Sequence, residues 1–403
     1  MSFGGEARRI RTPKLNLAQA AAAKAGPLHQ ALSQMGYPGL RKVQQIPVEN
    51  ILCERDILVV APTSAGKCFG KGTPIMLSSG KVVPVESIQP GDELMGPDGE
   101  ARKVLSTCTG SEELYLVQQQ RGIDYVVNES HILSLRITGM KEGDRTRCGG
   151  QLFSSYDLAN VAVKDYLAAP KTFRHVAKGW KSPCIETFKH GLGAPDEELP
   201  PYMLGLWFGD GAADAFKITT ADAEVVSSVC QYAADIGHLV TVDASGDRCP
   251  SYSVVSPEGK RAGAGNEINT PKRILRALGC LKHQDAGIPA VYRLANYYDR
   301  WQLLAGLLDA DGSLIRDSGY DFISKYERLA EDCAQVARSL GLHATVTPCE
   351  KTCTNTGTVG DYWRVYISGD VFRIPVRVPR KKALPVNMRT NPLLTGIKLV
   401  PQG

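Results

Sequence analysis

The sequence predicts a multidomain protein: a short N-terminal fragment, then an all-β unit, then an α+β unit made of two related halves. Three features lead to this fold class. The phosphate-binding-loop pattern APTSAGK at 61–67 is interrupted immediately after its lysine. Short apolar runs separated by Gly, Pro and Asp then continue to about residue 137, which is typical of β-hairpins. From about residue 200, an apolar segment ending in Asp-Gly occurs twice.

Composition and charge narrow the class of protein. The chain has 403 residues, 43% of them hydrophobic, and a net charge of +5, as expected of a globular chain of about two or three domains. The N-terminus is charged and no run of about eighteen apolar residues occurs, so we expect no signal peptide, no membrane partner and an intracellular location. Residues 371–403 hold seven Lys or Arg and no Asp or Glu, which favours an anionic partner such as nucleic acid.

The interruption of the loop falls at Cys68. A phosphate-binding loop continues after its lysine with a Ser or Thr that binds magnesium, and then with a helix. Here Cys68 takes the place of the hydroxyl residue, and Gly70, Gly72 and Pro74 prevent a helix. The sequence therefore predicts that a foreign segment begins at Cys68. A cysteine at such a break resembles the first residue of an intein, an insert that excises itself from its host protein.

Residues 1–67 resemble the start of a superfamily 2 helicase of the DEAD/DEAH or RecQ type, and so would be the flanking host segment, the N-extein. The resemblance rests on LRKVQQ around Gln44, on the strand-like run that follows and on the loop itself. It implies that Gln44 contacts adenine and that Gly66 and Lys67 contact phosphates. ATP is expected only for the intact host helicase, because the fragment lacks the hydroxyl and the second acidic motif that hydrolysis requires.

Residues 68–137 carry three motifs in a fixed order, which resemble successive motifs of the Hint fold of inteins. The motifs are CFGKGTPI at 68–75, GDELMGPDG at 91–99 and NESHILSL at 128–135. The resemblance implies the N-terminal part of an all-β splicing domain.

The same resemblance gives roles to three residues. Cys68 would attack the preceding carbonyl to form a thioester, His131 would protonate or distort the leaving amide, and Asn128 would hydrogen-bond to that amide. A thiol and an imidazole suit these roles near neutral pH. Taken singly, Cys68 and His131 would instead be interpreted as buried core residues.

Residues 138–195 are expected to form a linker or a subdomain that recognises DNA. Aromatic and basic residues are interleaved there, as on surfaces that contact a DNA backbone. The alternative is that the aromatic residues build a core. The residues concerned are Tyr156, Tyr166, Phe173 and Trp180, with Lys164, Lys171, Arg174, Lys178 and Lys181.

Residues 196–374 contain the internal repeat, with halves at 200–297 and 298–374. MLGLWFGDG at 203–211 corresponds to LAGLLDADG at 304–312, and a second pair of similar segments follows, each ending in glycine. The second copy matches the signature of the LAGLIDADG (DOD-type) homing endonucleases at eight of nine positions. The resemblance implies two pseudo-twofold αββαββα-like halves, so that a monomer acts as a pseudo-dimer.

Small residues predict that the two repeat helices pack closely, because they recur four positions apart on one face. They are Gly205, Gly209, Gly306 and Ala310. Gly211 and Gly312 follow the helices, where a left-handed residue is common. Asp210 and Asp311 are then expected at the C-terminal tips.

Two carboxylates at neighbouring helix ends repel each other and face the negative ends of both helix dipoles, so we expect bound cations. Oxygen ligands suit Mg²⁺. The resemblance implies that Asp210 and Asp311 are the metal-binding catalytic acids, that Lys282 in LKHQDAGIP assists them, and that each half lays its sheet along the major groove of double-stranded DNA. Lys325, in FISKYERLA, is a weaker candidate for a similar role, with a plain exposed lysine as an even alternative.

Residues 375–403 resemble the return of the chain from the nuclease to the splicing domain. Complete inteins continue to a His-Asn pair followed by Ser, Thr or Cys, and residues 399–403 contain none of these. We therefore expect a truncated Hint domain, because the gene is split, because it has decayed or because the sequence is a fragment. Its second junction then needs a separate C-terminal segment.

The predicted function is that of an intein-encoded homing endonuclease, making site-specific, magnesium-dependent double-strand breaks in the uninterrupted host gene. Two alternatives stay open: a degenerate remnant that only binds DNA, and an ATP-dependent helicase fragment. Asp210 and Asp311 are both intact, which favours the endonuclease over the remnant. The missing Walker B acid argues against the helicase.

Overall fold

The computed structural model describes residues 68–402 except 97–98, 108, 182–183, 189–198, 245–248, 258–268, 353–358 and 386–390. The expected helicase fragment at 1–67, with Gln44, Gly66 and Lys67, lies outside the described residues. The ATP-related expectations therefore stay predictions.

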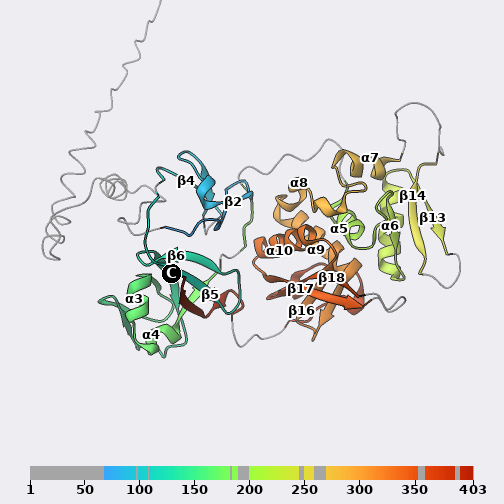
Figure 1. Cartoon of the computed structure of the whole chain (residues 1–403). Coiled ribbons are helices and arrows are strands. Elements are labelled where there is room, and N and C mark those ends of the chain that lie inside the picture. Colours follow the sequence, from blue (N-terminus) through green and yellow to red (C-terminus); the bar gives the residue numbers. More distant parts are fainter. Residues whose placement is uncertain are drawn as a thin grey trace, which may run out of the picture.

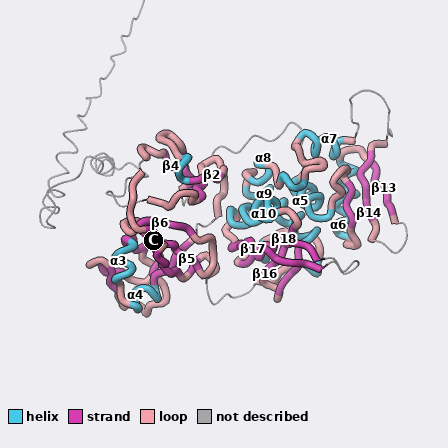
Figure 2. Tube along the Cα trace, viewed as in Figure 1, coloured by secondary structure: helices cyan, strands magenta, loops and turns pink. Residues whose placement is uncertain are grey.

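Strands dominate what we call the β-rich region, which consists of residues 68–180, drawn in blue and green, and the C-terminal strands β19 and β20, drawn in red (Figures 1 and 2). Two sheets of this region have the strand orders β10-β7-β11-β19 and β20-β5-β6, and the remaining strands form the hairpins β1–β2, β3–β4 and β8–β9. The strands are β1 (Pro74–Met76), β2 (Val82–Pro84), β3 (Glu93–Met95), β4 (Ala101–Lys103), β5 (Leu114–Gln119), β6 (Tyr125–Asn128), β7 (Ile132–Ile137), β8 (Thr146–Cys148), β9 (Gln151–Phe153), β10 (Leu158–Ala162) and β11 (Ala177–Trp180).

The boundary expected at residue 137 is wrong. β7 pairs with β10 on one side and with β11 on the other, so residues 158–180 complete the sheet rather than forming a separate subdomain. The helices α3 (Val163–Ala168) and α4 (Lys171–Val176) lie between these strands. Tyr166 and Phe173 are buried in the shared core, as the alternative interpretation had it, whereas Tyr156 is 75% exposed.

The end of the chain also lies in the β-rich region (Figure 1). β19 (Leu394–Thr395) pairs with β11, and β20 (Ile397–Pro401) pairs with β5 over five residues. Ile397 and Leu399 pack against the same core as β7. Strands from the two ends of the described chain thus build one region.

The described residues between 199 and 384 form the repeat region, in which helices and sheets alternate (Figure 2). No helix among the residues that the structure describes has both the length and the apolar character that a membrane crossing requires. The first half contains α5 (Pro201–Asp210), β12 (Lys217–Thr219), α6 (Ala223–Asp235), β13 (Leu239–Asp243), β14 (Ser251–Val255), α7 (Thr270–Ala277) and α8 (Ala290–Arg293). The second half contains α9 (Tyr297–Asp311), β15 (Gly312–Ile315), β16 (Gly319–Ser324), α10 (Glu327–Ser339), β17 (His343–Thr352) and β18 (Val359–Ser368).

The two halves share a topology but not all of its strands. Their antiparallel sheets have the orders β12-β14-β13 and β15-β16-β18-β17. The counterpart of β15 is reduced among the described residues of the first half to a single bridge, between Gly211 and Ile218. α6 and α10 each end before a glycine of positive φ, Gly237 (φ 68°) and Gly341 (φ 81°), which sends the chain into the next strand. The αββαββα-like order is therefore fuller in the second half.

Glycines let the repeat helices α5 and α9 pack backbone to backbone. A Cβ atom on Gly306 would lie 2.2 Å from the carbonyl oxygen of Tyr202, and one on Gly205 would lie 2.4 Å from that of Leu303. Further along, a Cβ on Gly209 would lie 2.3 Å from the Cβ of Ala310. The small residues four apart therefore have the packing role that the sequence predicts, and they bring the two helix ends together.

This packing predicts a large loss of stability for Gly306→Ala. The added methyl group meets main chain, which cannot rotate away, so we expect the free energy of unfolding to fall by about 2–3 kcal/mol. This holds although alanine favours a helix by about 1 kcal/mol over glycine. Urea unfolding measures the change. Gly279→Ala is the control: none of the described atoms lies within 4 Å of its added carbon, and its left-handed backbone costs only about 1 kcal/mol. Equal stability of Gly306→Ala and the unsubstituted chain would contradict the close packing.

The left-handed helix ends expected at Gly211 and Gly312 are not found. Both glycines are extended, with φ −85° and ψ 145° at Gly211 and φ −78° and ψ 143° at Gly312. The reason for glycine is close approach instead, because a Cβ would lie 2.2 Å from the Trp207 carbonyl oxygen at Gly211 and 2.5 Å from that of Leu308 at Gly312. The extended conformation leads the chain directly from each helix toward its strand.

The boundary expected at residue 374 also moves. Val376 and Val378 are buried in the core of the repeat region, so residues 375–384 complete that region before the chain returns to the β-rich region. A 3₁₀ turn at Val371–Arg373 precedes this segment, and another at Pro379–Lys381 lies within it. It runs against α9, and the main-chain amide of Leu384 donates to the carbonyl of Asp317 (2.9 Å).

A buried arginine connects the segment that leaves β11 to the repeat region. The guanidinium of Arg300, in the first turn of α9, donates to the carbonyls of Ile185, Glu186 (3.1 Å) and Ser339 (3.1 Å). The ring of Phe188 lies 5.0 Å from its Cζ. Burial lowers the pKa of Arg300 to about 10, which still leaves the side chain charged near neutral pH.

Candidate functional site

The two repeat aspartates lie at the ends of the packed helices. Asp210 is the last residue of α5 and Asp311 the last residue of α9. Because the glycine contacts hold the two helices together as far as Gly209 and Ala310, the carboxylates emerge side by side. Asp210 is half-buried and Asp311 is exposed, so the pair opens toward solvent.

The electrostatics of the pair oppose two negative charges. Burial raises the pKa of Asp210 to about 7, and the neighbouring carboxylate of Asp311 adds to the shift. Burial also raises the pKa of Asp311, and the nearby Lys351 and Lys381 ammonium groups oppose that shift. The two carboxylates can therefore both ionise only if positive charge nearby balances them.

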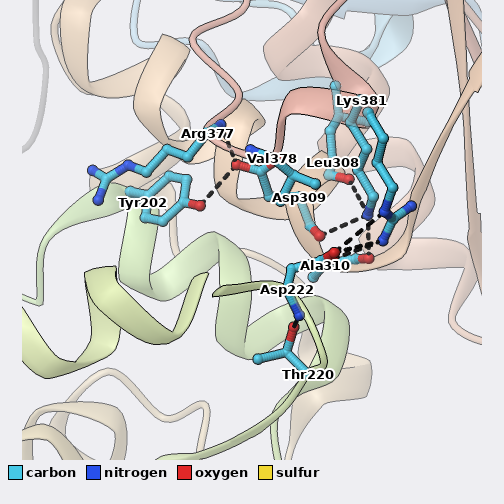
Figure 3. A network of polar contacts seen from close by, with 10 residues as sticks. Tyr202, Thr220, Asp222, Leu308, Asp309, Ala310, Arg377, Val378 and Lys381 are labelled. Carbon is cyan, nitrogen blue, oxygen red and sulfur yellow. Dashed lines mark hydrogen bonds and ion pairs between the residues drawn. The ribbon is translucent and has the colours of Figure 1, made fainter. Parts of the chain in front are cut away.

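Part of the positive charge comes from a lysine that sequence reasoning missed. Lys381 is 5% exposed, and its Nζ donates to the carbonyls of Leu308 (3.0 Å), Asp309 (2.6 Å) and Ala310 (2.8 Å) (Figure 3). These carbonyls belong to the last turn of α9, where the helix lacks its own donors and carries its negative end. A resident ammonium group therefore balances part of the negative charge of this site, beside the cations that the sequence predicts.

A second carboxylate in the same turn has a structural role. Asp309 is 2% exposed, and it accepts hydrogen bonds from the Tyr202 hydroxyl (2.7 Å) and from the amides of Arg377 (2.6 Å) and Val378 (3.3 Å) (Figure 3). These donors use its lone pairs inside the protein. Asp309 therefore fastens the segment carrying Lys381, while Asp311, two residues on, stays open.

A third carboxylate near Asp210 is already paired. Nε of Arg380 donates to Oδ1 of Asp222 (3.2 Å) and its Nη2 donates to Oδ2 (2.7 Å), in a two-pronged contact. Asp222 precedes α6, and its charge adds to the raised pKa of Asp210. The Arg380 contact leaves Asp210 and Asp311 as the acids available to a ligand.

The lysines predicted to assist lie at different places. Lys282 is exposed in the left-handed region (φ 66°), and its amide donates to the carbonyl of Ala213 (2.6 Å), just beyond the end of α5. Its main chain is thus anchored to the loop that follows Asp210. Lys325 is exposed two residues before α10, and no contact among the described residues connects it with the aspartates.

The Asp210 and Asp311 carboxylates suit a hard divalent ion that keeps water or substrate ligands, rather than a metal ion enclosed entirely by protein side chains. Among the described residues, no group of three or more His, Cys, Asp or Glu side chains gathers as a complete metal cage. Mg²⁺ is commonly bound by one or two carboxylates and keeps several waters or substrate phosphates. Asp210 and Asp311 would hold it, and a DNA phosphate would complete the site.

A separate site lies in the β-rich region, at Cys68. The amide of Cys68 donates to Oδ1 of Asn128 (3.1 Å), and the amide of Asn128 donates to the carbonyl of Cys68 (3.2 Å). Asn128 is 1% exposed, and its Nδ2 donates to Oε2 of Glu112 (2.6 Å). Cys68 is half-buried, and burial followed by the charge of Glu112 raises the pKa of its thiol.

His131 lies beside this site. It is buried, its ring centroid is 4.8 Å from that of Phe69, and its amide donates to the carbonyl of Asn128 (3.1 Å). A cavity of about 500 Å³ adjoins it, lined among others by Phe69, Thr73, Tyr125 and Trp180. The structure thus brings Cys68, Asn128 and His131 into one neighbourhood.

Comparison with family models defines the class of protein. Residues 68–176 match the model described as Hom_end-associated Hint, and residues 288–374 match the model described as Homing endonuclease. The chain therefore has one segment that matches a Hint model and one that matches a homing endonuclease model. The segment LAGLLDADG at 304–312 lies inside the second matched range.

Curated relatives resemble the chain over part of their length. A replicative DNA helicase DnaB of Mycobacterium intracellulare is 26% identical over 297 residues, covering 71% of this chain and 44% of the relative. The catalytic subunit of a V-type proton ATPase of Candida tropicalis is 30% identical over 34% of this chain and 13% of the relative. An iron-sulfur cluster assembly SufBD family protein of Mycobacterium leprae is 24% identical, covering 80% and 38%. The chain spans less than half the length of each.

Among solved structures, those of the homing endonuclease I-DmoI are similar to part of the chain. Its mesophilic variants are 16% identical with a TM-score of 0.29, covering 43% of this chain and 83% of that one. I-DmoI in complex with DNA and Ca is 15% identical with a TM-score of 0.28 over the same shares.

Of the two site residues that were not predicted, Lys381 could have been found from the sequence and Glu112 could not. Lys381 follows Asp311 by 70 residues, nearly the spacing of 72 between Asp210 and Lys282, so a comparison of the two halves could have found it. Glu112 precedes a strand in a stretch with no motif. Only its contact with Asn128 reveals it.

Proposed function

We propose that the repeat region cleaves both strands of DNA with magnesium, using Asp210 and Asp311 as metal-binding catalytic acids. The observation that carries this proposal is the pair of carboxylates at the ends of two helices packed through glycine. The fold places Asp210 where burial and the charge of Asp311 disfavour its ionised form and raise its pKa. Strongly shifted pKa values are typical of functional sites.

The residues divide the work. When bound, Mg²⁺ activates water and stabilises the leaving oxygen of a phosphodiester. Asp210 and Asp311 would hold it, and the Lys381 ammonium keeps the α9 turn in place and offsets negative charge. Lys282, anchored beside the loop after α5, would contribute a mobile positive charge near the phosphate.

The outward faces of the two sheets suit the proposed double-stranded DNA. In β18, Val365 and Ile367 are buried while Arg364 and Tyr366 point away from the core. Each sheet carries an ion pair between two of its strands: Arg364 of β18 with Asp321 of the neighbouring β16 (3.5 Å), and Lys217 of β12 with Asp243 of β13 across the central strand β14 (3.1 Å). Such exposed pairs contribute about 0–1 kcal/mol, so the basic side chains can turn to phosphates at little cost. Two such halves in one chain would act as a pseudo-dimer.

The proposed target is the host gene without the insert, read across the codon of Lys67. The named functions of the curated relatives differ widely, from a DNA helicase to a proton ATPase and an iron-sulfur assembly protein. That diversity is expected if the shared sequence is a mobile insert rather than a host enzyme. An insert that spreads must cut only targets it does not occupy.

Cleavage of that target is the direct test. A linear DNA carrying the joined host sequence is expected to be cut once in both strands with Mg²⁺ and not with EDTA, as resolved by gel electrophoresis. The control is the same DNA with the insert in place, which should stay intact. Tight binding without cleavage at any magnesium concentration would support the DNA-binding remnant instead.

A second function is favoured by the contacts of Cys68. We propose that the β-rich region converts the Lys67–Cys68 peptide bond into a thioester. Cys68 Sγ forms a bond to the Lys67 carbonyl carbon as the bond from that carbon to the Cys68 nitrogen breaks; the thiol loses its proton, and the nitrogen gains one with the help of His131. The hydrogen bond from the Cys68 amide to Asn128 supports this assignment, since it fixes the leaving nitrogen.

A further inference from the structure

A relay of two hydrogen bonds connects Glu112 with the main chain of Cys68. Asn128, at the end of β6, receives the Cys68 N–H on its Oδ1 (3.1 Å) and gives its Nδ2 hydrogen to Glu112 Oε2 (2.6 Å). Its own amide donates to the Cys68 carbonyl (3.2 Å), so one residue holds Cys68 at two points. Because Asn128 is 1% exposed, water does not compete for these contacts.

An asparagine amide can occupy the same space in two orientations that exchange its donor and its acceptor. In the wrong orientation, the Nδ2 hydrogens would face the Cys68 N–H, and two donors would meet in a buried place. Such a mismatch leaves buried groups unsatisfied. An ionised carboxylate only accepts, so Glu112 can receive Nδ2 but never Oδ1. Glu112 therefore selects the orientation that serves Cys68.

We propose that Glu112 is a positioning residue for the Cys68 junction: its carboxylate fixes the Asn128 amide so that Oδ1 accepts the Cys68 N–H. The functional meaning of this role rests on the proposed thioester chemistry, whereas the hydrogen-bond geometry does not depend on it. Holding the N–H fixes the plane of the peptide bond that Cys68 would attack. The residue type at 128 makes the support necessary, since a hydroxyl could rotate to suit either partner.

Glu112 also has an unfavourable effect on Cys68, because its negative charge opposes ionisation of the thiol. Its negative charge helps to keep the Cys68 thiol protonated, after burial itself. A carboxylate is thus unfavourable to thiolate formation, and its presence is explained by the hydrogen bond it accepts. Glutamine at 112 would separate the two effects, because its amide oxygen still accepts from Asn128 Nδ2 while the charge is gone.

Hydrogen exchange tests the geometry without any cleavage. In the full chain, NMR is expected to show the Cys68 amide exchanging at least about tenfold faster in Glu112→Ala than in the unsubstituted chain, as for the loss of one buried hydrogen bond. Glu112→Gln should stay within about threefold. Glu113→Ala is the matched control, because Glu113 is the exposed neighbour and should leave exchange unchanged. Unchanged exchange in Glu112→Ala overturns the proposal.

Release of the N-terminal piece by dithiothreitol tests the purpose. We expect Glu112→Ala to slow release about tenfold, as a lost positioning contact would, and Glu112→Gln to retain most of the rate. In an Asn128→Thr background, Glu112→Ala should have no further effect, because no amide is left to orient. If Glu112→Gln is as slow as Glu112→Ala in both measurements, charge rather than orientation is what matters and the proposal is wrong. If exchange follows the prediction but the unsubstituted chain releases nothing, the thioester chemistry fails and the positioning role stands.

Discussion

Asp210→Asn and Asp311→Asn are each expected to reduce DNA cleavage by about a thousandfold or more, because each removes a charged metal ligand. DNA affinity should stay within about threefold, since most contacts with the DNA backbone come from basic side chains elsewhere. Single-turnover cleavage and a binding titration in Ca²⁺ measure the two quantities. Asp214→Asn makes the same change four residues after Asp210, in an exposed turn, and should cut normally. Wild-type cutting by both variants would show that the metal-site assignment is wrong.

The same variants should not unfold the protein. The folded-state pKa of Asp210 is raised, so its ionised form opposes folding at every pH above the ordinary value for aspartate. Asparagine removes that opposition. We therefore expect the Tm of Asp210→Asn at pH 8 to be unchanged or higher without Mg²⁺. A lowered Tm would attribute lost cleavage to misfolding rather than to lost chemistry.

Short-range sequence patterns predicted the packing of the repeat helices. The small residues around Gly205 and Gly306 can be recognised within a short stretch of sequence. Their spacing of four positions places them on one face of a helix, which is a matter of local geometry. Gly211 and Gly312 were misjudged for a related reason. Glycine after a helix indicates either a left-handed turn or a close approach, and only the path of the following strand decides between them.

Long-range contacts were out of reach of the sequence. Lys381 caps α9 from a segment 70 residues beyond Asp311, and β7 obtains its partners from β10 and β11, which lie past the expected boundary. Motifs locate chemistry but not where a domain ends, because a central strand needs partners from wherever the chain returns. The motifs of Cys68, Asn128 and His131 were correctly grouped, yet Glu112, which contacts Asn128, belongs to no motif.

Dithiothreitol is expected to release a 67-residue N-terminal piece from the full chain, and Cys68→Ala to release none. The reagent's thiolate exchanges with the thioester formed at Cys68, so the piece leaves as a thioester of dithiothreitol. Because the pKa of the Cys68 thiol is raised, only a small thiolate fraction exists at pH 7, and release should be slow there and faster at pH 8.5. His131→Ala should slow release about a hundredfold, the lower range for loss of an acid–base group. Mass spectrometry of the products identifies the cut.

Cys230→Ala controls for the loss of an exposed thiol and should release the piece normally. Equal release from Cys68→Ala, or release at another peptide bond, would contradict the proposed thioester chemistry at Cys68. The endonuclease proposal would not be affected, because it has a separate test.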